Sequence, residues 1–169
     1  MKSHSQLVKE FTEESKGIKV PERPIPMETK SVRFLAKMMF SEIIELLESV
    51  YPNEDAVKVA HELIVEDQVE KRTLHGGVLP PTPQTNVEKI EAQMDAIVDC
   101  WYYGLDSAAK HGMNLETVFL LVHKANMDKR NPVTGKFERR DDGKVIKPAG
   151  WQPADIRSEV EKQLAEGGF

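Results

Sequence analysis

Apolar side chains recur at intervals of three and four residues through most of the chain, and this spacing constrains the fold more than any other feature. Segments with this spacing cover residues 3–16, 28–50, 54–73, 86–111, 115–129 and 153–165. A helix places residues three and four apart on one face, whereas a half-buried strand needs strict alternation. The pattern predicts an all-α fold, an antiparallel bundle of about four to six helices.

The boundaries of the predicted helices carry capping and breaking residues. Ser3 or Ser5 is expected to begin the first helix and Gly17 to end it, and Asn114 is expected to cap the helix at 115–129. Prolines place connectors at 18–27 and 78–85. Helical spacing is interrupted after residue 132 and resumes at 153, and the turn signal at 141–143 predicts a small hairpin or irregular segment in between.

Length and composition fit one domain with a sizeable core. The chain has 169 residues, of which 40% are hydrophobic and 30% are charged. We expect one domain over 1–169, with an N-terminal helix and Pro-rich connector (1–27), a helical core (28–130), and a basic loop followed by a C-terminal helix (131–169).

Charge, hydropathy and cysteine content indicate which partners and which cellular compartment the sequence fits. A net charge of -5 argues against general binding to nucleic acid or to anionic membranes. There is no apolar run of about 18 residues and no signal-peptide core, so we expect no membrane span. Cys100 is the single cysteine, which excludes an intrachain disulfide and fits a reducing compartment. These features predict a cytoplasmic protein.

Glu42 lies in an unusual place on the predicted helix at 28–50. A helical wheel puts it inside an apolar stripe that is formed by Leu35, Met38, Met39 and Leu46. An unpaired carboxylate is costly to bury, so Glu42 needs a partner such as a cation, a metal or a helix end. The same helix has a second apolar face, with Phe40, Ile44 and Leu47, which predicts contact with two layers, one of them from another subunit.

The segment at 86–111 repeats this combination of apolar stripe and acidic edge. The stripe, which we expect to be core, consists of Ile90, Met94, Ile97, Val98, Trp101, Leu105 and Ala108. Asp95 and Asp99 border it, and a divalent cation would relieve their mutual repulsion. If the two long helices pack antiparallel, these two residues can meet Glu42 and Glu45, and such hard oxygen donors suit Mg²⁺ or Mn²⁺. The alternative is that all four are solvated surface charges.

The acid pairs, together with the sequence after them, resemble the all-α nucleoside triphosphate (NTP) pyrophosphohydrolases. The matching motifs are Glu42-x-x-Glu45, the acid pair within 95–103, the run 123–129 with its Asn-Met-x-Lys, and the run 142–148 with its Gly-Lys-x-x-Lys. The resemblance covers roughly residues 32–156 and includes MazG-like proteins, dimeric dUTPases and, most closely, phosphoribosyl-ATP pyrophosphohydrolases. Two departures are Ser41, where the family often has Glu, and the i, i+4 spacing of Asp95 and Asp99, where Glu-x-x-Asp is usual.

The resemblance implies Mg²⁺-dependent hydrolysis of a nucleoside triphosphate or related nucleotide to the monophosphate and pyrophosphate, with house-cleaning of non-canonical nucleotides as one role. It implies metal ligands at Glu42, Glu45, Asp95 and Asp99, and a general base at Glu45 or Glu48. It implies substrate ligands at Asn126, Lys129, Lys144 and Lys147, with Arg139 and Arg140 as further candidates.

Two other functions stay open on the sequence. One is the phosphoribosyl-ATP pyrophosphohydrolase step of histidine biosynthesis. The other is a non-catalytic metal- or nucleotide-binding helical bundle, which Ser41 and the absent Glu-x-x-Asp favour. In each case we expect a homodimer or homotetramer, because the second apolar face of the Glu42 helix needs cover.

Overall fold

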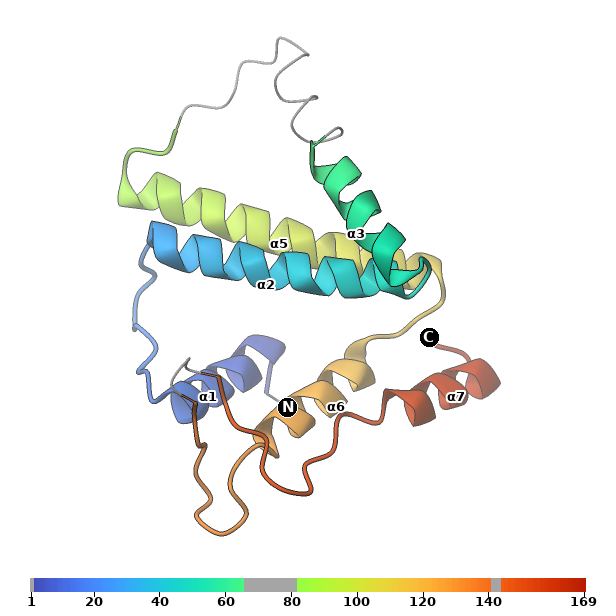
Figure 1. The fold of residues 1–169 in the computed structure, drawn as a ribbon. Helices are drawn as coiled ribbons and strands as arrows, with labels where there is room; N and C mark the ends of the chain where they lie inside the picture. The colour runs from blue at the N-terminus through green and yellow to red at the C-terminus, as the bar shows by residue number, and fades with distance from the viewer. Residues whose placement is uncertain (1, 66–81, 141–143) are drawn as a thin grey trace. The chain divides into compact units, whose positions relative to one another are not determined.

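The computed structural model describes residues 2–65, 82–140 and 144–169 (Figure 1). In these ranges the chain forms helices and no strand, which confirms the all-α prediction. The helices are α1 (His4–Lys16), α2 (Thr29–Glu48), α3 (Asn53–Glu62), α5 (Asn86–Lys110), α6 (Glu116–Met127) and α7 (Ile156–Glu166). The predicted end of the helix at 54–73, most of the connector at 78–85 and the turn at 141–143 lie outside the described residues.

Residue contacts divide the chain into two units. We call residues 24–96 the middle unit, and residues 1–23 with 97–169 the terminal unit. Helix α5 contributes its first half to the middle unit and its second half to the terminal unit. The expected single domain over 1–169 stays a prediction.

Most helix ends follow the capping residues that the sequence indicated. Ser3 accepts the N–H of Gln6 at 3.3 Å, and the Gln6 side chain accepts the Ser3 N–H at 2.8 Å, which is a complete capping box. Gly17 ends α1 with a φ of 59°, a left-handed conformation that glycine adopts without steric cost. The N-cap of α6 is Leu115 rather than Asn114, but Asn114 lies just before it, and its Oδ1 accepts the N–H of Glu116, the first residue of α6, at 3.0 Å.

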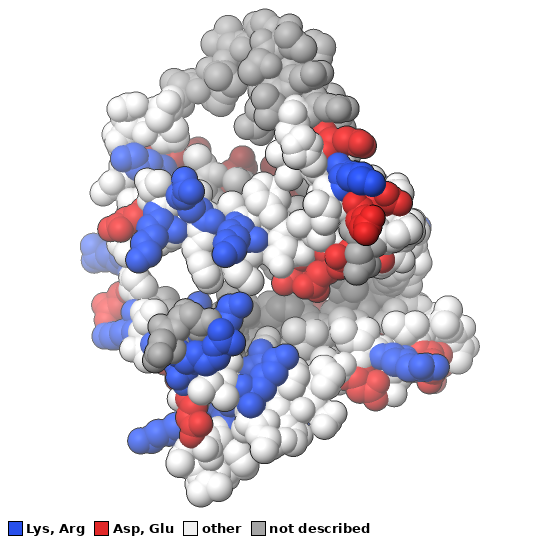
Figure 2. Space-filling view, in the orientation of Figure 1, with Lys and Arg blue, Asp and Glu red and all other residues white. Residues whose placement is uncertain are grey.

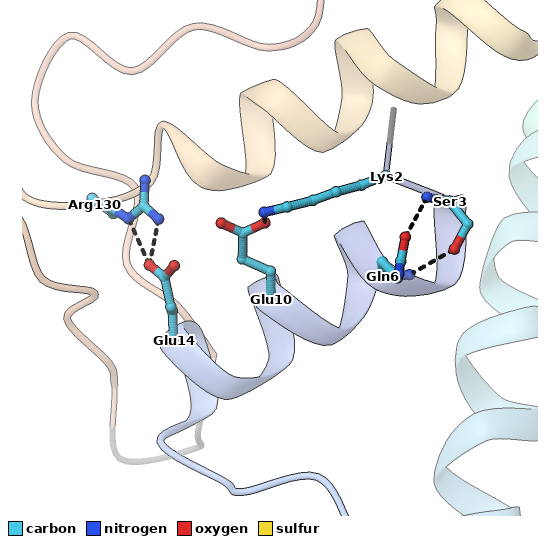
Figure 3. A network of polar contacts seen from close by, with 6 residues as sticks. All are labelled: Lys2, Ser3, Gln6, Glu10, Glu14 and Arg130. Carbon is cyan, nitrogen blue, oxygen red and sulfur yellow. Dashed lines mark hydrogen bonds and ion pairs between the residues drawn. The ribbon is translucent and has the colours of Figure 1, made fainter.

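In the terminal unit, α6 packs against α1 and α7. The segment after α6 is bound to the C-terminal half of α1. Arg130 binds Glu14 (Figure 3), and Arg139 donates to the Ser15 carbonyl. Phe11 and Phe137 add an edge-to-face contact with ring centres 5.7 Å apart. Two isolated antiparallel bridges, Arg130 with Phe137 and Arg139 with Val145, form the small irregular segment that the sequence predicted.

In the middle unit, α2 packs against α3. The contact is close because α3 presents alanines: Ala56 is fully buried and Ala60 nearly so. Leu35 and Met39 of α2, one turn apart on one face, are half-buried, and so are Ile44 and Leu47 on a different face. Other large apolar side chains of α2 are exposed, among them Phe34, Phe40 and Leu46, and Leu46 exposes 69% of its surface.

The apolar stripe of α5 is not a core within one chain. Met94, Val98 and Trp101 each expose half of their surface or more, and Ala108 is the one member of the stripe that is buried. The prediction of core was therefore wrong for the single chain, because helical spacing identifies an apolar face but not the surface that covers it. Among the described residues, none of the helices has the length and apolar composition of a bilayer-spanning segment.

Candidate functional site

The predicted metal ligands lie on the two long helices. Glu42 and Glu45 stand one turn apart on α2, and Asp95 and Asp99 stand one turn apart on α5. All four side chains are exposed, as is Glu48 on the last turn of α2. The sequence was therefore correct in placing each pair on one helix face.

A side-chain clamp fixes where α2 begins relative to the first half of α5. Gln93 accepts the N–H of Met27 at 2.7 Å and donates to the Met27 carbonyl at 3.0 Å. Met27 lies two residues before α2, so the start of α2 lies beside Gln93. Glu42 is thirteen residues further along α2, about 20 Å at 1.5 Å per residue, whereas Asp95 is only two residues from Gln93.

One chain therefore does not bring Glu42 to Asp95, as the predicted mid-helix meeting required. Consistent with this register, residues 2–65, 82–140 and 144–169 contain no group of three or more His, Cys, Asp or Glu side chains placed to hold a metal ion. The carboxylates fit Mg²⁺ or Mn²⁺ by donor type, but within the middle unit Glu42 and Asp95 lie at different positions along the two helices. The assignment of these residues as metal ligands stays a prediction.

The predicted substrate ligands lie in the terminal unit, where positive charge is concentrated. Residues 124–147 contain eight Lys and Arg against four Asp and Glu, in a chain whose net charge is -5. Figure 2 shows Lys and Arg side chains gathered over α1, α6 and the segment that follows α6. A local surplus of this kind can attract an anion that the whole chain would repel.

Two of the predicted ligands form a direct contact at the end of α6. The Lys129 ammonium donates to Asn126 Oδ1 at 2.6 Å, and both side chains are half-buried. Burial, and then the nearby charge of Lys147, hold the pKa of Lys129 below its ordinary value of 10.5. The sequence motif thus located a cation and an amide that lie side by side.

Trp151 joins this group, although the sequence had not singled it out. The ammonium of Lys147 lies 4.3 Å from the centre of the Trp151 ring, and that of Lys129 lies 5.5 Å from the same centre. The indole N–H donates to the Ala125 carbonyl at 2.7 Å. We call Asn126, Lys129, Lys147 and Trp151 the lysine–tryptophan cluster.

The remaining basic candidates have other positions. Arg139 is held by the Ser15 carbonyl at the end of α1, so its guanidinium supports the fold. Lys144 is exposed, and its carbonyl accepts the N–H of Arg140 at 2.9 Å. Lys144 is thus outside the lysine–tryptophan cluster, and its predicted role in substrate binding stays a prediction.

Comparison with known proteins gives one informative match. No protein-family model and no functionally curated protein matches the chain. The fold is similar to a 1.78 Å crystal structure from Exiguobacterium sp. 255-15, with a TM-score of 0.82, 29% sequence identity and coverage of 98% of both chains. That protein is provisionally named an NTP pyrophosphohydrolase.

The chain has the fold of this protein. The similarity extends over 98% of both chains, and so includes the segments of this chain that carry the acid pairs and the lysine–tryptophan cluster. It supports the family resemblance at the level of NTP pyrophosphohydrolases. It does not distinguish the MazG-like branch from the others.

Proposed function

We propose that the protein hydrolyses a nucleoside triphosphate, or a related nucleotide, to the monophosphate and pyrophosphate in the presence of Mg²⁺ or Mn²⁺. The observation that carries the proposal is the full-length similarity to a protein provisionally named an NTP pyrophosphohydrolase. The two acid pairs and the lysine–tryptophan cluster supply the types of side chain that this chemistry needs.

The acidic residues would hold the divalent cation. Glu42, Glu45, Asp95 and Asp99 offer hard oxygen donors, and the cation would neutralise phosphate charge and lower the pKa of the attacking water. Glu45 or Glu48 would accept a proton from that water. Lys129 and Lys147 would hold the anionic phosphates, and Asn126 would orient both Lys129 and the sugar or base.

We further propose that a second copy of the chain completes the protein, as a homodimer or homotetramer. Three alanines are the buried hydrophobic residues of the described part, which is far too little for a domain of this size. An apolar cavity of about 800 Å³ also lies open in the terminal unit, lined by Trp101, Phe119 and Phe169 among others. Assembly would cover these surfaces and could join acid pairs that one chain keeps apart.

Two alternatives make different predictions for substrates. A phosphoribosyl-ATP pyrophosphohydrolase would release pyrophosphate from phosphoribosyl-ATP and from few other nucleotides. A non-catalytic bundle would bind metal or nucleotide without turnover. Ser41, which stands where the family often has Glu, favours this alternative.

Pyrophosphate release from a nucleotide panel separates the three functions. The panel contains canonical and modified nucleoside triphosphates and phosphoribosyl-ATP, each with Mg²⁺, with Mn²⁺ and with chelator. We expect metal-dependent release from at least one triphosphate. Release from phosphoribosyl-ATP alone would select the first alternative, and binding without release from any member would select the second.

A further inference from the structure

Trp151 brings together two cations that are distant in the sequence. Lys129 follows α6, and Lys147 belongs to the irregular segment eighteen residues later. Both ammonium groups lie within 5.5 Å of the centre of the Trp151 ring. Their charges repel each other, and the negative face of an indole partly offsets this cost.

The position of the ring is fixed by the end of α6. The Lys129 N–H bonds to the Asn126 carbonyl at 3.3 Å and not to that of Ala125, its i-4 carbonyl. The free Ala125 carbonyl instead accepts the indole N–H of Trp151 at 2.7 Å. Trp151 therefore satisfies a carbonyl near the helix end and, through the same contact, holds its ring beside Lys129.

The two ammonium groups have no acidic partner among the described residues. The ion pairs of the terminal unit involve other cations, such as Arg130 with Glu14 and Lys124 with Asp128. Two neighbouring positive charges without a carboxylate suit a ligand with several anionic oxygens. A pyrophosphate group has such oxygens on adjacent phosphorus atoms and can contact both lysines.

We propose that Trp151 is a positioning residue, which holds Lys129 and Lys147 together so that both bind one pyrophosphate group. The proposal rests on the proposed function for the identity of the ligand, since the pyrophosphate would be part of the nucleotide or the product. Trp151 itself makes no bond to the ligand.

A double-mutant cycle tests the coupling between Trp151 and Lys147. Binding of inorganic pyrophosphate to the full chain is measured by calorimetry in the presence of chelator, so that neither turnover nor the metal site contributes. Trp151→Leu and Lys147→Met are each expected to weaken binding about tenfold, which is about 1.4 kcal/mol. The double variant should lose little more than either single variant, because each substitution removes the same arrangement.

Two variants serve as controls. Trp151→Phe retains an aromatic face but loses the indole N–H that binds the Ala125 carbonyl, and should restore part of the affinity that Trp151→Leu loses. Lys136→Met removes one exposed charge from the same segment, and pyrophosphate binding should change less than about twofold, as expected for a solvated surface charge. If Trp151 only supported the fold, the losses in the double variant would multiply, and this result would overturn the proposal.

Intrinsic fluorescence gives a second readout that needs no Leu variant. Saturating pyrophosphate should offset the positive charge of the two ammonium groups beside the indole and so change the emission of the protein. The change should persist in Trp101→Phe and disappear in Trp151→Phe, since Trp101 and Trp151 are the two tryptophans. No change in the native protein would overturn the proposal. Pyrophosphate binding with the expected coupling, but without nucleotide turnover, would instead count against the proposed function alone.

Discussion

At the scale of single residues, the charge state of Lys129 links the lysine–tryptophan cluster to pH. Burial and the charge of Lys147 lower the pKa of Lys129. Only the protonated amine attracts an anion, so pyrophosphate binding should weaken as pH rises through this lowered pKa, before an ordinary lysine would lose its proton. Lys147→Met removes a repelling charge and raises the pKa of Lys129.

The measurement is pyrophosphate affinity between about pH 7 and pH 11. Lys147→Met should bind more weakly at pH 7, and its affinity should fall at a higher pH than that of the native protein. Lys136→Met is the matched control and should follow the native profile. A profile for Lys147→Met that is unchanged, or that falls at a lower pH, would contradict this account of Lys129.

Glu42→Gln tests the proposed metal ligand while keeping the shape of the side chain. Because Glu42 is exposed, the substitution should leave the fold intact and lower metal-dependent turnover about 100-fold or more, as removal of one key electrostatic group does elsewhere. Turnover is measured as pyrophosphate release over a range of Mg²⁺ concentrations. Glu28→Gln, at an exposed residue just before α2 whose side chain makes no capping bond, is the control. Undiminished activity of Glu42→Gln would remove Glu42 from the ligand set.

Sequence motifs identified Asn126 and Lys129 of the candidate site, whereas Trp151 was found only from contacts in the structure. Asn126 belongs to α6, and Lys129 follows it by three residues, just after the end of the helix. A sequence motif can therefore identify their contact. Trp151 contacts Ala125 at a sequence separation of 26 residues, and no periodicity relates the two positions. A tryptophan in a loop after several lysines was the available signal, and by itself it does not indicate which cations the ring contacts.

At the scale of the elements, the beginning of α5 offers a direct test of helix capping. The Glu88 carboxylate accepts the N–H groups of Thr85 at 3.0 Å and Gln84 at 2.8 Å, and Thr85 Oγ1 accepts the Glu88 N–H at 3.2 Å. The bonds from Thr85 and then Gln84 hold the pKa of Glu88 below its ordinary value of 4.5. A lowered carboxyl pKa contributes stability above the unfolded-state pKa, and this contribution is lost as pH falls through the folded-state value.

Glu88→Gln should therefore lower Tm at pH 7, and its difference from the native protein should shrink as pH falls below about 4.5. Thermal unfolding followed by circular dichroism at several pH values measures this difference. Glu91→Gln, one turn further along α5, changes an exposed Glu without such capping bonds and should shift Tm little at any pH. A difference for Glu88→Gln that grew in acid would contradict the capping role.

Helix boundaries were predictable because their causes are local. Ser3, Gly17 and Asn114 act within four residues of the ends that they define. The register of α2 against α5 was not predictable, because it depends on Gln93, whose amide binds a backbone 66 residues away. Helical spacing predicts which face of a helix a residue occupies. Its position along the neighbouring helix depends here on the contact between Gln93 and Met27. For this reason Glu42 and Asp95 do not meet as expected.

At the scale of the whole molecule, the exposed apolar surface predicts assembly. Most of the apolar stripe of α5 is exposed in one chain, as are several large apolar side chains of α2, among them Phe34, Phe40 and Leu46. Light scattering coupled to size exclusion should give a mass of two or four times 19.1 kDa, and Tm should rise with protein concentration. Val98→Asp, which puts a charge on the α5 stripe, should shift the population toward smaller species, whereas Lys89→Ala on α5 should not. A monomer with a concentration-independent Tm would contradict the proposed assembly.

The most direct test of the account is the identity of the products formed from a nucleoside triphosphate. Phosphorus NMR resolves pyrophosphate, orthophosphate, monophosphate and diphosphate in one spectrum. With Mg²⁺ present, we predict nucleoside monophosphate and pyrophosphate in equal amounts, and no reaction with chelator. Formation of nucleoside diphosphate and orthophosphate would contradict a pyrophosphohydrolase. Formation of nucleoside monophosphate and pyrophosphate in the presence of chelator would contradict metal dependence.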